Sequence, residues 1–187
     1  MSRPQEPQPA KLIVGLLFRD FGIQRQALTD LRDHFGPMDL LTEPKVFTYT
    51  TYYDREMGSG LYRQTCSFVQ LIQTERMPEV KLSTNRMEIE LSIKGKRQVN
   101  IDPGVLSKER LVLATGKNYT HRIYLRNGIY ADLTLIYQNG AYRPLPWTYP
   151  DYRDVSLRRL LGIVRQKLIF QYTNRLPRKV PQKGASL

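Results

Sequence analysis

The stretch that decides the fold is KLIVGLLF, residues 11–18. This short apolar run predicts a strand in the centre of a sheet. Asp20 follows it and can cap a helix whose apolar residues recur at helical spacing, namely Ile23, Ala27, Leu28, Leu31 and Phe35. Gly36-Pro37 predicts the end of that helix, because glycine allows a left-handed turn and proline blocks continuation.

The next residues predict a β-hairpin. Residues 38–53 are rich in β-branched and aromatic side chains, so we expect a strand over most of this range. A turn at 56–60 leads into a second strand at 61–72, and the two strands are expected to pair.

Residues 78–94 leave two structures open. Val80, Thr84, Met87 and Leu91 form a helical stripe that follows Pro78, whereas residues 87–94 alternate strictly between polar and apolar, as in a strand. The stripe favours a helix. With a further strand at 97–101, the order is β-α-β-β-α-β, which is typical of a ferredoxin-like core with helices on one face of an antiparallel sheet.

The C-terminal half predicts an antiparallel meander. Asn127-Gly128 and Asn139-Gly140 are hairpin-turn dipeptides between alternating apolar residues. They follow a strand at 110–115 and divide the chain into strands at 120–126, 129–138 and 141–145. Asp154 can then cap a final amphipathic helix with an apolar stripe of Leu157, Leu160, Leu161, Val164 and Leu168.

We therefore predict an α+β fold, in which a ferredoxin-like βαββαβ core is extended by a C-terminal antiparallel β-meander and a final amphipathic helix. Residues 1–10 are expected to be a disordered N-terminal segment, 11–173 a single domain, and 174–187 a basic disordered tail.

Charge is the unusual feature of the composition. The 187 residues carry 29 Lys and Arg against 17 Asp and Glu, a formal net charge of +12. From residue 152 onward there are nine basic residues and one acidic residue, so +8 of the charge lies in the last 36 residues. This gradient favours a polyanionic partner, such as a nucleic acid or a nucleotide-like anion, although solubility alone could explain it.

Several classes of protein are excluded by the sequence. No apolar run approaches the roughly 18 residues of a membrane span, and the N-terminus is not a secretory signal, so we expect a cytoplasmic protein without a membrane partner. One cysteine and two histidines cannot form a thiolate zinc site. A P-loop fails at Gly116-Lys117, because Asn118 follows where a hydroxyl is needed. The sequence does not identify a cofactor or an oligomeric state.

One pair of side chains in the meander could support acid–base chemistry. If Asn127-Gly128 is a two-residue turn, Ile123 pairs with Asp132, and His121 becomes a diagonal neighbour of Asp132 on the same sheet face. A carboxylate beside an imidazole orients it and raises its pKa, as a general acid or base requires. The alternative is an exposed polar sheet face without chemistry.

Two loops are further candidates. Asn100 and Asp102 end a predicted strand before the Pro103-Gly104 turn, where Asp102 could cap the turn or line a site. In the segment 147–153, the aromatic side chains could stack bases and the arginine could contact phosphate, or the segment could be a plug that seals the last helix onto the sheet. The residues concerned are Trp147, Tyr149, Tyr152 and Arg153.

Three functions follow from these features. The first is binding of a nucleic acid or nucleotide-like anion by the basic last helix and the 147–153 loop. The second is an enzyme for a small phosphorylated or anionic substrate, with His121 as the acid–base, Asp132 orienting it, Lys117 and Arg122 holding the anion, and Asp102 binding substrate or metal. The third is an interaction scaffold without catalysis.

Many short blocks of the sequence together resemble one family. They include KLIVGLLFRD at 11–20, FGPMD at 35–39, VNIDPG at 99–104, LATGK at 113–117, THRIYL at 120–125, GIYAD at 128–132 and WTYPDY at 147–152. Over residues 11–171 the chain resembles the prokaryotic family known as domain of unknown function 4416. Asp132 departs mildly, because glutamate is expected there in many relatives. The resemblance implies a single stand-alone domain and no defined activity.

Overall fold

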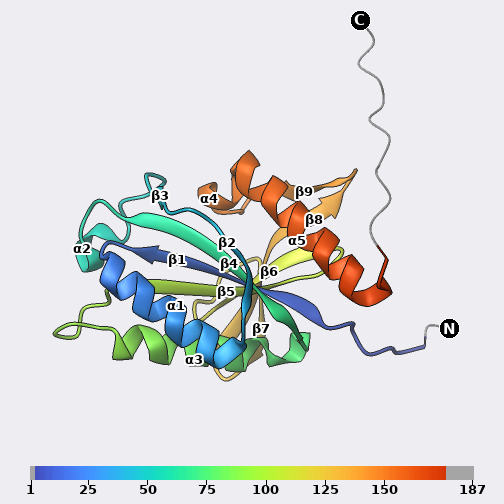
Figure 1. Cartoon of the computed structure of the whole chain (residues 1–187), viewed down its shortest axis with the longest axis horizontal. Coiled ribbons are helices and arrows are strands. Elements are labelled where there is room, and N and C mark those ends of the chain that lie inside the picture. The colour runs from blue at the N-terminus through green and yellow to red at the C-terminus, as the bar shows by residue number, and fades with distance from the viewer. Residues whose placement is uncertain (1–2, 176–187) are drawn as a thin grey trace, which may run out of the picture.

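The computed structural model describes residues 3–175 and forms one mixed α/β fold around a large antiparallel sheet (Figure 1). In chain order the elements are β1 (Ala10–Phe18), α1 (Phe21–Phe35), β2 (Met38–Leu41), β3 (Lys45–Val46), α2 (Asp54–Met57), β4 (Tyr62–Ile72), the 3₁₀ turn η1 (Thr74–Arg76), α3 (Met77–Glu90), β5 (Val99–Leu106), β6 (Arg110–Thr115), β7 (Arg122–Arg126), β8 (Ile129–Gln138), β9 (Ala141–Pro144), α4 (Pro150–Arg153) and α5 (Val155–Thr173).

The sheet runs in the order β2-β4-β1-β5-β6-β8-β7, with β3 added beside β4 and β9 beside β8. Helices α1 and α3 lie against one face, and α4 and α5 lie against the other (Figure 1). The sheet is thus larger than a four-stranded ferredoxin-like core, because the meander continues the same sheet instead of forming a separate layer.

The apolar run KLIVGLLF, residues 11–18, forms a strand in the interior of the sheet, as predicted. Every residue of β1 is buried, and the strand pairs antiparallel with β4 on one side and β5 on the other. Leu12, Val14 and Leu16 pack toward α1 and α3, whereas Ile13 packs toward α5. A strand covered on both faces must be apolar on both, which explains why KLIVGLLF does not alternate.

The helix caps and helix ends predicted from the local sequence are largely confirmed. The carboxylate Oδ1 of Asp20 accepts from the backbone N–H groups of Gly22 and Ile23, at 2.6 and 2.9 Å, and α1 ends before Gly36 as predicted. The ambiguous range 78–94 is helical as far as Glu90. Its last residues leave the helix and form a turn in which Ile93 bridges Lys96.

Two predicted ranges were wrong in extent. Residues 38–53 contain only the short strands β2 and β3, and the predicted turn at 56–60 is partly the helix α2.

The predicted turn at Pro103-Gly104 does not exist, because β5 continues through both residues to Leu106. Proline is tolerated there because the ladder between β5 and β6 begins only at Gly104, so no β6 residue needs an N–H from Pro103.

The meander and the last helix were predicted well. Asn127 and Asn139 both have positive φ, of 55° and 51°, as two-residue hairpin turns require. Asp154 caps α5 by accepting from the N–H of Leu157 at 2.9 Å. No helix within residues 3–175 is long and apolar enough to cross a membrane. The predicted basic tail lies outside the described residues from position 176 onward.

Candidate functional site

A band of polar side chains crosses the sheet face that α4 and α5 cover. Residues that pair directly across antiparallel strands share a face. Gly104 pairs with Leu113, which pairs with Asp132, and Asp132 pairs with Arg122. Asp102 lies two residues before Gly104 and so shares its face. Leu113 lies on the same face and belongs to the apolar cluster that packs against α5. The polar band therefore borders the apolar core of this face.

Asp132 is the centre of the outer half of this band. Its Oδ2 accepts from Arg122 Nε at 2.9 Å and lies 3.2 Å from His121 Nε2, and the carboxylate is almost fully buried. Arg122 uses its remaining nitrogens to donate to the backbone oxygen of Lys117 at 3.0 Å and to the hydroxyl of Tyr149 at 3.1 Å. The predicted contact between His121 and Asp132 is therefore present, but Arg122 is occupied in holding Asp132 and Tyr149.

Two irregularities in the strands create this arrangement. Arg126 pairs with Ile129 as predicted, but Tyr124 already pairs with Tyr130, so Leu125 is an extra residue in β7. The bulge turns Arg122 onto the face of Asp132, where regular pairing would have put Ile123. In β8 the register against β6 also shifts, at Thr134, whose hydroxyl donates to the Asp132 backbone oxygen at 3.0 Å.

Some side chains of the 147–153 loop lie on the surface, whereas others hold the fold together. The Trp147 ring stacks on the His121 ring, with centroids 5.0 Å apart and planes at 15°, and its Nε1 donates to Leu133 O at 2.7 Å. Tyr152 is only 2% exposed, so its ring is not available for stacking on a base. Arg153 donates to two backbone oxygens of its own loop, Thr148 O and Pro146 O, and thereby fixes the loop conformation.

Exposed aromatic rings and a lysine lie around His121 and Arg122. Tyr119 is 64% exposed and contacts the His121 ring edge-on at 5.4 Å. Lys117 Nζ donates to the Tyr52 hydroxyl at 2.6 Å and lies 4.7 Å from the centre of that ring. We call this set the aromatic–cation surface: Tyr52, Lys117, Tyr119, Trp147 and Tyr149. The sequence predicted Lys117, Trp147 and Tyr149 but missed the two other tyrosines, because the segments that carry them are irregular.

The inner half of the band surrounds Asp102, which lies within β5 instead of before a turn. Asn100 Nδ2 donates to Asp102 Oδ2 at 2.7 Å, and Asn100 Oδ1 accepts from Arg97 Nη1 at 2.6 Å. Lys81 Nζ and Arg63 Nη1 lie 3.7 and 3.9 Å from the Asp102 carboxylate. Asn100 and Asp102 are therefore members of a charged network and not of a loop.

Two side chains of α3 complete the edge of β5 beside Asp102. Glu88 Oε1 accepts from the N–H of Ile101 at 2.6 Å, and Lys81 Nζ donates to Ile101 O at 2.8 Å. These bonds replace the ladder that Pro103 interrupts. Burial raises the pKa of Glu88 despite the nearby cations. Neither residue was among the predicted site residues, because Lys81 and Glu88 look like the exposed side of an amphipathic helix.

Tyr53 contacts both halves of the band, because Arg97 Cζ lies 5.9 Å from its ring centre and the Tyr52 ring meets it edge-on at 5.1 Å. Burial raises the pKa of Tyr53, and Asp102 from the inner half and Tyr149 from the outer half both add to the rise.

Within residues 3–175, no group of three or more His, Cys, Asp or Glu side chains is arranged to hold a metal ion. Burial also raises the pKa of the Cys66 thiol to about 12, so this thiol remains protonated and is a poor nucleophile.

The basic residues of α5 do not form an open stripe for phosphates. Arg158 Nη1 donates to Tyr142 O at 3.0 Å, Arg165 Nε donates to Lys108 O at 2.7 Å, and Lys167 Nζ donates to Asp39 O. These three side chains hold α5 onto the sheet. Arg159 is the exposed basic residue of this helix.

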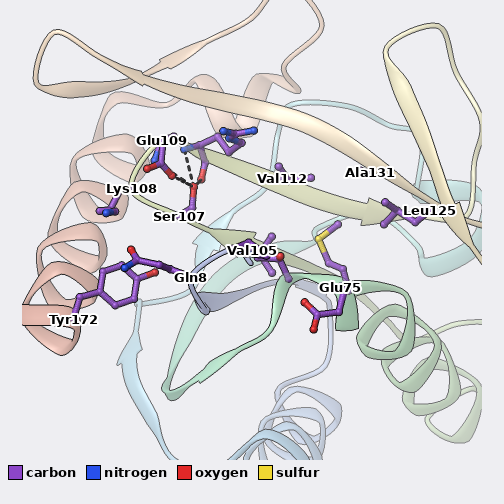
Figure 2. A pocket seen from close by; sticks show the side chains of 14 residues that line it. Gln8, Glu75, Val105, Ser107, Lys108, Glu109, Val112, Leu125, Ala131 and Tyr172 are labelled. Atoms are coloured by element: carbon purple, nitrogen blue, oxygen red, sulfur yellow. Dashed lines mark hydrogen bonds between the residues drawn. The ribbon is translucent and has the colours of Figure 1, made fainter. Parts of the chain in front are cut away.

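A separate groove of about 560 Å³ lies on the opposite face of the sheet, beside η1 and α3. Figure 2 shows Tyr172 at one end of the groove and Leu125 at the other, with Val105 and Val112 between them. Its wall is mostly apolar, and none of the predicted site residues lines it. The polar band is therefore the candidate site, and this groove is not part of it.

The chain belongs to the family described as domain of unknown function (DUF4416), which matches residues 8–168. The match covers all strands and the greater part of α5, so the whole polar band lies inside the family domain. No curated protein and no solved structure matches the chain.

Proposed function

We propose that this protein binds a nucleotide-like anion at the aromatic–cation surface. The observation that carries the proposal is the interleaving of exposed rings with a lysine. Trp147 and Tyr149 are 41% and 50% exposed, and Lys117 lies against the ring of Tyr52. Aromatic faces stack on bases whatever their sequence, and lysine supplies a point charge for phosphate.

The rigidity of Trp147 supports a recognition role. Its indole is fixed by the stack on His121 and by the hydrogen bond to Leu133 O. A ring that is already held in place loses little conformational entropy when a ligand stacks on it. Tyr149 is similarly tied, through the Arg122 guanidinium, to the buried Asp132.

The geometry favours a mononucleotide over a polymer. A polynucleotide needs several phosphate contacts along a basic track. The helix α5 offers Arg159, whereas Arg158, Arg165 and Lys167 are engaged with the protein. One cluster of rings with one lysine suits a ligand with one base and a short phosphate chain.

Calorimetric titration of the full chain with ATP, GTP and a short single-stranded RNA tests this proposal. Lys117→Gln should weaken binding of the mononucleotides and reduce its dependence on salt, because one phosphate contact is lost. Arg159→Gln removes the same charge from α5 and is the matched control, which should leave binding unchanged. Equal weakening by both variants would reduce the effect to net charge, and binding of RNA alone would favour the polymer.

The contact between His121 and Asp132 favours a second candidate, acid–base catalysis on the bound anion. A carboxylate 3.2 Å from an imidazole nitrogen fixes the orientation of the ring, and the other ring nitrogen can exchange a proton with a ligand. If the protein hydrolyses its ligand, His121→Gln should abolish release of phosphate while nucleotide binding persists. Turnover that is unchanged in His121→Gln would remove His121 from the reaction.

We also infer that the half of the sheet around β1 is a ferredoxin-like core. Its strands lie in the order β2-β4-β1-β5, and each pair is antiparallel. With α1 after β1 and α3 after β4, this is the arrangement expected of a split βαβ fold. The meander then extends that core through β6.

A further inference from the structure

An arginine lies flat across the middle of the sheet, on the face of the polar band. Arg63 projects from β4, and its guanidinium covers Gly15 at the centre of β1. A Cβ on residue 15 would lie 2.6 Å from Arg63 Cζ, which is closer than atoms can approach. Glycine weakens the interior of a strand, and its use there commonly marks a close approach from outside the strand. Gly15 therefore makes room for Arg63.

The guanidinium is enclosed but incompletely bonded. The side chain is 10% exposed, and Nε and Nη2 have no hydrogen-bond partner among residues 3–175. Asp151 Oδ2 lies 3.1 Å from Nη2 as an ion pair without hydrogen-bond alignment, and the Tyr152 ring centre lies 5.1 Å from Cζ. The Tyr152 hydroxyl is also unpartnered within the same residues. A buried donor without an acceptor costs roughly 1–3 kcal/mol.

The Nε/Nη2 edge of another guanidinium, that of Arg126, shows which kind of group such an edge binds. Arg126 Nε and Nη2 donate to the two carboxylate oxygens of Glu79, at 3.0 and 2.8 Å. This side-on arrangement is the bidentate geometry that guanidinium groups form with carboxylate and phosphate. In Arg63 the corresponding edge makes no hydrogen bond within residues 3–175, and Nη2 has only the ion pair with Asp151.

Arg63 and Asp151 both line a groove of about 450 Å³ between the β2–β3 segment and the α4–α5 segment. Leu40, Leu157 and Leu160 give this groove an apolar wall, and the Tyr49 hydroxyl lies along it. The lining also includes the charged residues Glu43, Lys45 and Asp154. A concave site with an apolar wall and a few convergent polar groups is typical of small-molecule binding.

The geometry points to a second ligand site, in which this groove takes a small molecule with an apolar body and an oxyanion, a carboxylate or a phosphate, that binds the Nε/Nη2 edge of Arg63. Asp151 takes up a proton from solvent when the oxyanion enters and donates to it beside the guanidinium. This site uses none of the residues of the aromatic–cation surface, so it stands independently of nucleotide binding.

The groups around Asp151 explain why it can take up that proton. Burial raises the pKa of Asp151, and the carboxylate of Asp102 adds to the rise, while Arg63 lowers it. The hydroxyls of Tyr152 and Tyr49 also lie near it, and Glu43, Lys45 and Asp154 line the same groove. Because a second carboxylate competes for Arg63, the neutral form of Asp151 is the one that tolerates an added anion. Binding should therefore be tighter at weakly acidic pH than at neutral pH.

Titrations of the full chain with hexanoate, inorganic phosphate and hexanol, followed by NMR, test this site. The readout is the Nε–H resonance of Arg63, and that of Arg126, whose fork is already filled, is the internal control. Hexanoate or phosphate should move the Arg63 resonance and leave that of Arg126 in place, and which of the two binds more tightly identifies the oxyanion. No movement with either anion, or an equal response to hexanol, would overturn the proposal.

Two variants separate binding from folding. Asp151→Asn keeps the shape of the side chain and removes the competing charge, so hexanoate or phosphate should bind about tenfold more tightly at neutral pH and lose its pH dependence. A merely structural role for Asp151 predicts no gain. Arg63→Lys should abolish bidentate binding. If Arg63→Lys does not fold, the Asp151→Asn titration still decides the matter, because unchanged or weaker binding in that variant contradicts the proposal.

Discussion

Gly15→Ala is the sharpest perturbation of the polar band. The new methyl group would lie 2.6 Å from Arg63 Cζ, and the guanidinium is held from the other side by the Tyr152 ring. Either the side chain lifts away from the sheet or β1 shifts. Forcing extra atoms into a packed interior costs about 1–3 kcal/mol.

The ion pair with Asp151 adds to this cost. Both side chains are nine-tenths buried, and loss of one partner of a buried pair costs about 3–5 kcal/mol when the other charge is left without compensation. Alanine in place of glycine offsets about 0.4–1 kcal/mol through the unfolded chain. Because Arg63 can retain part of the pair, we expect a net loss of about 3 kcal/mol. For a domain of this size, this loss lowers Tm by about 6–12 °C.

Denaturant unfolding followed by circular dichroism measures the loss directly. Gly116→Ala is the matched control, because a Cβ there meets nothing within 4 Å, and it should change stability little. In an Arg63→Leu background, Gly15→Ala should cost less than about 1 kcal/mol, because the clash is relieved. A Gly15→Ala variant as stable as the parent, or one with the same cost in both backgrounds, would refute the reasoning.

Three other variants test separate parts of the account. Gly162→Ala, in open space within α5, should raise the free energy of unfolding by about 0.5–1 kcal/mol in denaturant titrations. Asp39→Asn leaves the fully buried ammonium of Lys11 without its partner and should cost about 3–5 kcal/mol. Burial raises the pKa of Asp39, but hydrogen bonds from Lys11 and Ser67 and the charges of Lys11 and Lys167 together lower it. Its contribution to stability is therefore present above the ordinary pKa of 3.8 and is lost as the pH falls below that value, which an acid titration of the parent and the variant will compare. Deletion of Leu125 removes the bulge and should turn Arg122 away from Asp132, which the NMR resonance of the Arg122 side chain will report.

Local chemistry determined most of what could be predicted from the sequence. Asp20 and Asp154 cap their helices through contacts within three residues, and the Asn-Gly dipeptides fix their hairpins through their own backbone angles. The apolar run at 11–18 identified an interior strand that is paired on both sides. Each of these features depends on near neighbours in the sequence and not on distant ones.

The site depended on long-range contacts that no local pattern reveals. His121 and Asp132 were expected to meet through regular pairing, but the bulge at Leu125 brings Arg122 to the carboxylate instead. His121 reaches Asp132 from the turn that precedes β7. The continuation of β5 through Pro103 depends on side chains from α3 that satisfy its free edge.

Arg63 shows the same limit most clearly. Nothing near it in the sequence distinguishes it from an exposed strand residue. Its burial depends on Gly15 beneath it and on Asp151 and Tyr152 beside it, from segments far away in the chain. The Tyr152 ring was likewise expected in the binding loop, but a short helix, α4, turns it into the core.

The most direct test of nucleotide binding uses the only tryptophan of the chain. Its indole Nε1–H donates to Leu133 O beside the proposed ligand, so a ¹⁵N-labelled sample gives one indole resonance that reports on this surface. Titration with ATP or GTP should move that resonance in a saturable manner, and Lys117→Gln should weaken the apparent affinity. An indole resonance that stays in place at millimolar nucleotide would contradict the account.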